Sequence, residues 1–275
     1  STLSIAVSSN CCVSALPAYT GTLLTDTYLS GPLVINADIN LFSGQALYFT
    51  SGEFLFAPNV KINVNDNASV HIDNSHLYSC SSMWNGVNVK DGGKILLGQS
   101  PTYDNLIEDA IVAIDINNQA TTSLSTILAA TRTTFNKNHI DIKISDYVRS
   151  SSTYPFTIDN CVFTCRNLPF TSSAWPQTGT VSAAATASAD LRYCVPGALA
   201  GLPPPFLTQS GFTVTNLKSP YSSQTSQTAV QLTGIGSTNS GTAYPIIIGN
   251  SNTSGSFNLF DAHNRGINAE NSNIR

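Results

Sequence analysis

The sequence predicts an all-β chain folded as a right-handed parallel β-helix with one long irregular excursion. Three observations support this prediction. Short strands of one pattern recur at a nearly constant spacing, and apolar and polar residues alternate strictly within them. No window of a dozen residues keeps the apolar spacing of an amphipathic helix, and the β-branched residues and asparagines that dominate these stretches are poor helix formers.

The recurring unit is a short strand that follows a turn. Its clearest copies start at Gly86, Ala113, His139 and Gly266, and the first three are 27 and 26 residues apart. Between these copies lies a second element, a polar residue followed by alternating apolar ones, as in the stretch that starts at Asn105. A period in the twenties with two or three short strands per repeat is typical of a solenoid.

Alternation within the strands assigns their two faces. Val, Ile and Leu are expected to point into the core, and Asn, Asp, Lys and Thr to point outward. Asparagine tolerates left-handed backbone and forms local hydrogen bonds, so we expect most asparagines at turns or in stacked amide ladders. Trp84 stands between two strands of successive repeats and is expected to pack at that corner.

The repeat divides the chain into four segments. Residues 1–32 are expected to form an N-terminal cap or lead-in, and residues 33–165 the regular coils. Residues 166–205, rich in Pro, Ala and Ser, carry little period and are expected to leave the solenoid as an excursion. Residues 206–275 resume the pattern, and we expect further coils beyond residue 275 because the last repeat is incomplete.

Composition excludes several classes of partner. Charged residues make up 10% of the chain, whereas a typical soluble domain has about 25%. The 12 basic and 16 acidic side chains form no run of either sign, so we expect neither nucleic acid nor anionic lipid as a partner. No stretch approaches 18 consecutive apolar residues, and the N-terminus lacks the pattern of a signal peptide, so no membrane span is expected.

The six cysteines indicate disulfides or buried thiols, and we favour disulfides. Cys165 and Cys194 bracket most of the excursion, which makes them the candidate pair. The spacing of Cys161 and Cys165 lacks a second pair or a histidine cluster, so no zinc site is expected.

Several segments between about residues 33 and 163 resemble the β-helix regions of large exported proteins of Bacteroidota, many of them cargo of the type IX secretion route. The matching stretches are 39-INLFSG-44, 54-FLFAP-58, 60-VKI-62, 75-SHLYSC-80, 83-MWNGV-87, 107-IEDA-110 and 134-TFNKN-138. The most distinctive is the Cys-x-x-Met-Trp-x-Gly-Val block that starts at Cys80. The resemblance implies an extracellular adhesin, surface filament or stalk, and it carries no catalytic residues.

One row of outward polar residues is the candidate ligand-binding face. The repeat alignment places Asn88, Asp115 and Asp141 at the same strand position in neighbouring coils, about 4.8 Å apart. Asp115 and Asp141 would then stand near the roughly 5 Å separation of a retaining glycosidase, or could hold Ca²⁺. No aromatic ladder accompanies this pair, and Glu108 and Asp109 with His139 are an unsupported acid–base set because the acids lie in a turn.

Three functions follow in order of preference. The first is a structural or adhesive surface protein that binds extracellular surfaces or polysaccharides through many weak hydrogen bonds, together with other modules or copies of itself. The second is a glycan-binding module that uses the Asn88 face, or Trp175 and Tyr193 in the excursion as stacking platforms. The third is a polysaccharide lyase or hydrolase that uses Asp115 and Asp141. No cofactor is expected, apart from the calcium alternative.

Overall fold

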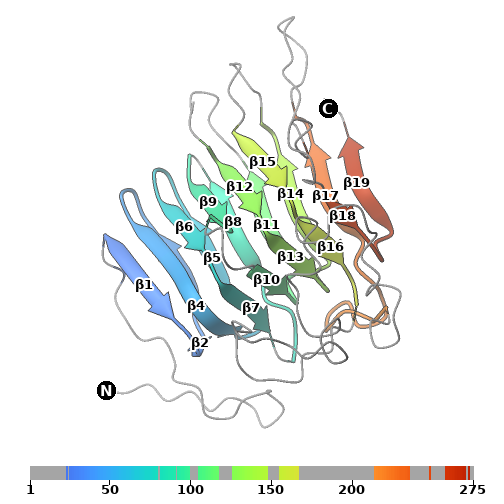
Figure 1. The fold of residues 1–275 in the computed structure, drawn as a ribbon, viewed down its shortest axis with the longest axis horizontal. Helices are drawn as coiled ribbons and strands as arrows, with labels where there is room; N and C mark the ends of the chain where they lie inside the picture. Colours follow the sequence, from blue (N-terminus) through green and yellow to red (C-terminus); the bar gives the residue numbers. More distant parts are fainter. Residues whose placement is uncertain are drawn as a thin grey trace, which may run out of the picture.

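The computed structural model is all-β. It describes residues 23, 25–79, 81–90, 92–99, 105–117, 126–147, 155–166, 214–235, 248, 258–270 and 272, and these residues form 19 strands and no helix. The strands form two sheets, of 12 and 7 strands, and all their strand pairs are parallel. Figure 1 shows the strands side by side from β1 to β19 in nearly the order of the sequence.

Hydrogen bonding arranges the strands in three columns, each a series of parallel neighbours. Column 1 contains β1 (Asp26–Ser30), the first half of β4 (Ala46–Phe56), β6 (Ser69–Ile72), β9 (Lys94–Leu97), β12 (Leu128–Thr131) and β15 (Phe156–Asp159). Column 2 contains β2 (Leu33–Ile35), the second half of β4, β7 (Ser75–Ser79), β10 (Asn105–Glu108), β13 (Thr133–Asn136), β16 (Val162–Thr164) and β18 (Leu259–Phe260). Column 3, the seven-stranded sheet, contains β3 (Ile39–Leu41), β5 (Lys61–Val64), β8 (Gly86–Lys90), β11 (Val112–Asn117), β14 (Ile140–Ser145), β17 (Thr228–Thr233) and β19 (Arg265–Glu270).

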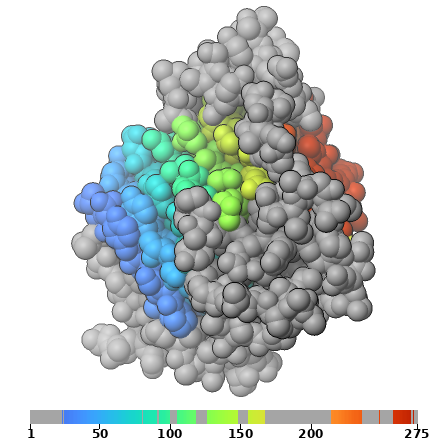
Figure 2. Space-filling view, viewed as in Figure 1, coloured from blue at the N-terminus to red at the C-terminus, as the bar shows by residue number. Residues whose placement is uncertain are grey.

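The chain visits these columns in a fixed order, first column 1, then column 2, then column 3. Strand β4 joins columns 1 and 2 into one sheet, because its first half pairs with β6 and its second half with β7. After β17, Ile248 forms a parallel bridge with Ile158 of column 1 before the chain reaches β18 and β19. Figure 2 shows the described strands following one another across one face of the molecule, from the blue N-terminal strands to the red C-terminal ones.

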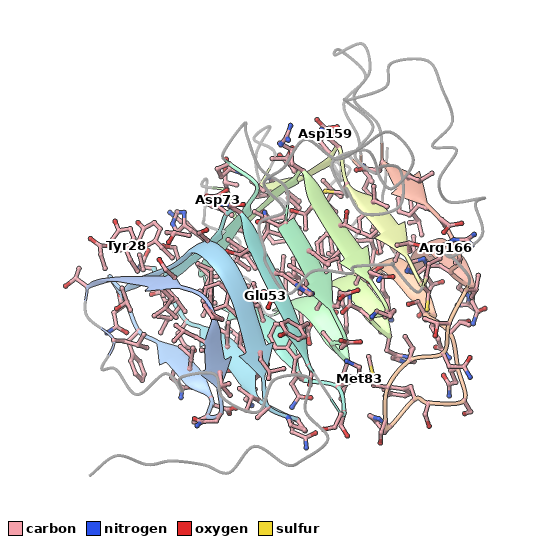
Figure 3. The ribbon with its side chains drawn as sticks, turned by 60° about the horizontal axis from the view of Figure 1, so that its bottom comes forward. Tyr28, Glu53, Asp73, Met83, Asp159 and Arg166 are labelled. Atoms are coloured by element: carbon pink, nitrogen blue, oxygen red, sulfur yellow. The ribbon has the colours of Figure 1, made fainter. Side chains whose placement is uncertain are left out.

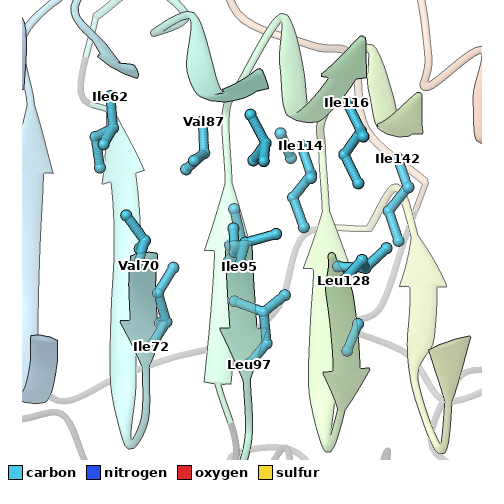
Figure 4. Close-up of a cluster of buried hydrophobic side chains, with 14 of the residues drawn as sticks. Ile62, Val70, Ile72, Val87, Ile95, Leu97, Ile114, Ile116, Leu128 and Ile142 are labelled. Carbon is cyan, nitrogen blue, oxygen red and sulfur yellow. The ribbon is translucent and has the colours of Figure 1, made fainter. Parts of the chain in front are cut away.

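Alternation within each strand builds the core. In column 3, Ile62, Val87, Ile114 and Ile142 occupy the same register position on four successive strands and are fully buried. Figure 4 shows this row facing a second row from column 1 that includes Val70, Ile95 and Leu128. Each β-branched or Leu side chain thus packs on the side chain of the next strand, which is the packing that such residues favour on a pleated surface.

Column 2 contributes aromatic rings to the same core. Phe135, Phe163 and Phe260 occupy one register position on β13, β16 and β18. Their rings stack nearly parallel, with centroids 5.2 Å and 4.9 Å apart. The predicted corner role of Trp84 is confirmed, because its fully buried ring stacks on Phe56 at 4.1 Å and its indole N–H donates to the Glu108 carbonyl.

Asparagines hold the turns between columns, as predicted. Asn74 and Asn160 both have positive φ and precede strands of column 2. Asn105 uses its whole amide at the same corner: its Oδ1 accepts the Ser75 N–H at 3.1 Å and its Nδ2 donates to the Ile72 carbonyl at 2.9 Å. These bonds satisfy backbone groups that would otherwise be buried without partners.

Candidate functional site

An outward-facing series of polar side chains runs across all of column 3. We call it the polar row, and it consists of Asn40, Asn63, Asn88, Asp115, Lys143, Gln231 and Asn268, which are register partners on successive strands. Every member is at least partly exposed. The row begins as an amide ladder, in which the Asn63 Nδ2 donates to the Asn40 Oδ1 at 2.8 Å.

Asp141 is not a member of this row, so the predicted Asp115–Asp141 pair is wrong. The register partner of Asp115 on β14 is Lys143, and their charged groups lie 3.6 Å apart. The error is a shift of two residues. Ile140, Ile142 and Ile144 alternate with polar residues, so a shift of two keeps every apolar residue on the core face and leaves the apolar pattern unchanged.

Asp141 instead belongs to a buried polar pair. Its Oδ2 lies 2.7 Å from the Nε2 of His263, and its Oδ1 accepts from the Asn138 Nδ2 at 2.9 Å. The His263 and Asp141 side chains are 2% and 0% exposed. Burial raises the pKa of Asp141. Burial alone would lower the pKa of His263, but the Asp141 carboxylate outweighs it and raises that pKa above its usual value.

The corner between columns 2 and 3 is crossed by residues 214–226, which we call the strap. Leu217 packs with Met83 and Cys165, and the Ser219 carbonyl accepts the Met83 N–H at 2.8 Å. Further along, the Tyr221 ring stacks on His139 at 3.8 Å. Met83 and Arg166 lie on the side of the molecule where the orange strap runs (Figure 3).

Beside the strap, the ends of the column 2 strands carry a cluster of ionisable groups. We call it the charge cluster, and its members are the ionisable residues His76, Glu108, Asp109, Lys137 and Lys218 and the amide of Asn136, which donates to Glu108. Glu108 and Asp109 are 5% and 1% exposed. The Lys218 Nζ lies 2.6 Å from the Asp109 Oδ2 and also donates to the Ser79 carbonyl. The strap is thereby held to the body by a charged hydrogen bond.

The two acids of the cluster respond differently to burial. Burial alone would raise the pKa of Glu108, but Lys137, together with the hydrogen bonds from His76 and Asn136, holds it well below its usual range. The pKa of Asp109 is raised, because burial outweighs the lysines and the neighbouring Glu108 adds to the effect. The sequence analysis placed both acids in a turn, which is correct for Asp109, whereas Glu108 is the last residue of β10. Nothing in the sequence indicated Lys218, which is 109 residues from Asp109.

A second outward series, which the sequence analysis missed, is aromatic. Tyr28, Tyr48 and His71 are register partners on β1, β4 and β6, and successive rings stack with centroids 4.4 Å apart. Tyr28 is 64% exposed. The available signal was strand alternation around Tyr28 itself, in a segment that the sequence analysis assigned to the lead-in.

The predicted disulfide is not supported. Cys165 is a free, buried thiol that donates to the Thr215 carbonyl at 3.2 Å and accepts the Ser226 N–H at 3.3 Å. Cys161 is also buried, and its thiol donates to the Ala130 carbonyl at 3.5 Å. No disulfide occurs within the described ranges. Cys194 lies outside the described residues, as do Trp175 and Tyr193. Residues of the strap, and not a disulfide partner, contact Cys165.

The described residues contain neither a candidate metal centre nor a candidate membrane-spanning helix. Within these residues, no group of three or more His, Cys, Asp or Glu side chains is arranged to hold a metal ion. The same part of the chain contains no helix of the length and apolarity that crossing a membrane requires. Comparisons of the chain with family models, curated proteins and solved structures gave no match.

Proposed function

We propose that the chain is a right-handed parallel β-helix that serves as a structural and adhesive element on a cell surface. The fixed visiting order of the three columns supports a solenoid, since each circuit adds one strand to every column. Stacked circuits bury one another's apolar rows, and this makes a stiff body from a chain with few charges. The resemblance to exported β-helix regions favours an extracellular location.

The observation that carries the adhesive role is the continuity of the polar row. Its members run from Asn40 to Asn268 over seven neighbouring strands and remain partly exposed. Amide groups at the roughly 4.8 Å strand spacing present donors and acceptors in a regular line. Such a line suits an extended hydroxyl-rich partner, which would be bound by many weak hydrogen bonds. A polysaccharide of the cell surface or matrix has this chemistry.

Binding of the purified chain to arrayed neutral and acidic polysaccharides tests this proposal. We expect the double variant Asn88→Ala/Gln231→Ala to lose binding. The matched control is Thr50→Ala/Thr157→Ala, which changes two exposed positions of column 1 and should bind as the wild type does. Unchanged binding of the polar-row variant would remove the adhesive role from this face.

A second candidate, glycan binding at the aromatic series, rests on the exposed ring of Tyr28. This ring lies at the end of the Tyr48 and His71 stack and is held there by it. Aromatic faces bind the apolar faces of sugars, and a stacked ring is already oriented. In the same array, Tyr28→Ala should then lose binding, whereas Phe42→Ala, which removes a similarly exposed ring, should retain it.

The hydrolase alternative is not proposed, because it depended on Asp115 and Asp141 facing each other. One carboxylate pairs with Lys143 and the other is buried against His263.

A further inference from the structure

The strap crosses four successive turns between columns 2 and 3. It contacts Met83, Asp109, His139 and Cys165, each of which belongs to a different repeat. Of these four contacts, the one to Asp109 joins two charged side chains. The strap therefore holds Lys218 in one place against the body of the molecule.

Lys218 and Asp109 are positioned for more than an ion pair. The Lys218 Nζ lies 2.6 Å from the Asp109 Oδ2, and the Asp109 side chain is 2% exposed. The other oxygen, Oδ1, has no hydrogen-bond partner among the described residues and lies 3.9 Å from the Lys137 Nζ. An amine in contact with a buried, incompletely solvated carboxyl group is the arrangement that amide formation requires.

The surroundings favour the protonated form of the Asp109 carboxyl group. Burial raises the pKa of Asp109, with Glu108 adding to the effect, so transfer of a proton from the Lys218 ammonium to the carboxylate is assisted. Burial alone would lower the pKa of Lys137, but Glu108 and Asp109 raise it, so Lys137 keeps its charge. A fixed cation near Oδ1 stabilises the negative oxygen that develops there during attack.

We propose that Lys218 and Asp109 are joined by an intramolecular isopeptide bond. The Lys218 ammonium passes one proton to the Asp109 Oδ2, and the resulting neutral amine attacks Cγ. A C–N bond forms, and the tetrahedral oxyanion on Oδ1 faces Lys137. The nitrogen then gives a second proton to Oδ2, the Cγ–Oδ2 bond breaks, and one water molecule leaves. An ammonium and a carboxylate thus become an amide and water, with no oxidant or further reactant.

The bond would join the strap to the second turn that it crosses, across 109 residues of sequence. Opening of the strap would then require a covalent bond to break, where the ion pair alone could separate. This proposal does not depend on the proposed adhesive function, although resistance to pulling suits a surface protein.

The test is the intact mass of the 275-residue chain. The chain is first allowed to fold, and it is then denatured and reduced for the measurement. We expect a mass lower than that of the sequence by one water molecule. Trypsin should yield a branched product in which residues 95–132 are joined to residues 193–265, uncut at Lys218. Lys218→Arg keeps the ion pair but removes the nucleophilic amine, so it should show the full mass. The control Lys143→Arg should lose water as the wild type does.

Two outcomes would overturn the proposal. One is a wild-type chain with full mass after prolonged incubation in the folded state. The other is a loss of water that occurs without the branched peptide, or that is as large in Lys218→Arg as in the wild type. Either result would indicate a cyclic imide at Asp109. The branched peptide is sought in the wild type, so the test does not depend on the folding of any variant.

Discussion

The Nε2 of His263 lies 2.7 Å from the Oδ2 of Asp141, although 122 residues separate the two positions in the sequence. The contact joins the turn before β19 to the start of β14, so two strands of column 3 are linked by a buried pair of ionisable groups. The pair makes stability depend on pH.

The expected dependence follows from the pKa of His263, which is raised above the ordinary value of 6.5. A raised folded-state pKa contributes stability that is complete below the unfolded pKa and is lost as the pH rises through the folded value. The raised pKa of Asp141 has the same sign, because the folded chain again binds protons more tightly. The unfolding midpoint of the wild type should therefore fall as the pH rises above 6.5.

His263→Gln tests this expectation, since it should flatten that fall. His71→Gln is the control, because burial lowers the pKa of His71, so its protonation changes stability mainly below pH 6.5 and in the opposite direction. The unfolding midpoints of both variants are measured by thermal unfolding at several pH values, monitored by circular dichroism. An equal slope in His263→Gln and the wild type would show that the pair does not control this dependence.

The parallel columns could be predicted because their signal is local. A core residue such as Ile116 is flanked by the polar residues Asp115 and Asn117, and the same alternation recurs in later repeats. The register of Asp141 could not be fixed in this way, because moving the strand by two residues preserves the pattern. In the observed register Asp141 contacts His263, and that contact is nonlocal.

The charge cluster could not be predicted from the sequence for a related reason. Lys218 belongs to the strap, and nothing in the sequence near it specifies which turn it reaches. The stack of Tyr28 on Tyr48 likewise depends on which strands are neighbours. Local alternation predicts which face a side chain occupies, whereas the partners on that face depend on the three-dimensional register.

The phenylalanine stack should dominate stability at the C-terminal end of column 2. Phe163 is fully buried and stacks on both Phe135 and Phe260. Phe163→Ala removes both ring contacts and leaves a cavity, so it should destabilise by about 3–5 kcal/mol. Phe42→Ala deletes a ring that is 63% exposed and should change stability little. Denaturant unfolding compares the two, and similar losses would contradict the assigned packing.

Carboxylate-to-amide substitutions should separate the buried cluster from the polar row. Glu108→Gln preserves shape but removes the nearer of the two carboxylates that face Lys137, which lie 3.3 Å and 3.9 Å from its Nζ. Breaking such a buried pair costs roughly 3–5 kcal/mol. Asp115→Asn removes the partly exposed pair with Lys143, and exposed pairs contribute only about 0–1 kcal/mol. Chemical denaturation measures the free energy of unfolding of both variants. Comparable losses of stability would show that burial does not distinguish these sites.

Gly86 should be the least replaceable glycine of column 3. Its φ is +74°, and a Cβ there would lie 1.8 Å from the Val112 carbonyl oxygen, so an alanine would push β8 away from β11. Gly44 has a similar φ of +82°, but a Cβ there has no atom within 4 Å. Gly44→Ala therefore carries only the left-handed backbone strain of about 1–2 kcal/mol.

Gly86→Ala adds the clash between backbones and should cost roughly 3 kcal/mol or more, which is in the range of severe core substitutions. Equilibrium unfolding of the two alanine variants gives the difference, because the shared strain of the left-handed backbone cancels between them. If both variants lost the same stability, β8 and β11 could not be as close as the parallel pairing of Val87 with Ile114 requires.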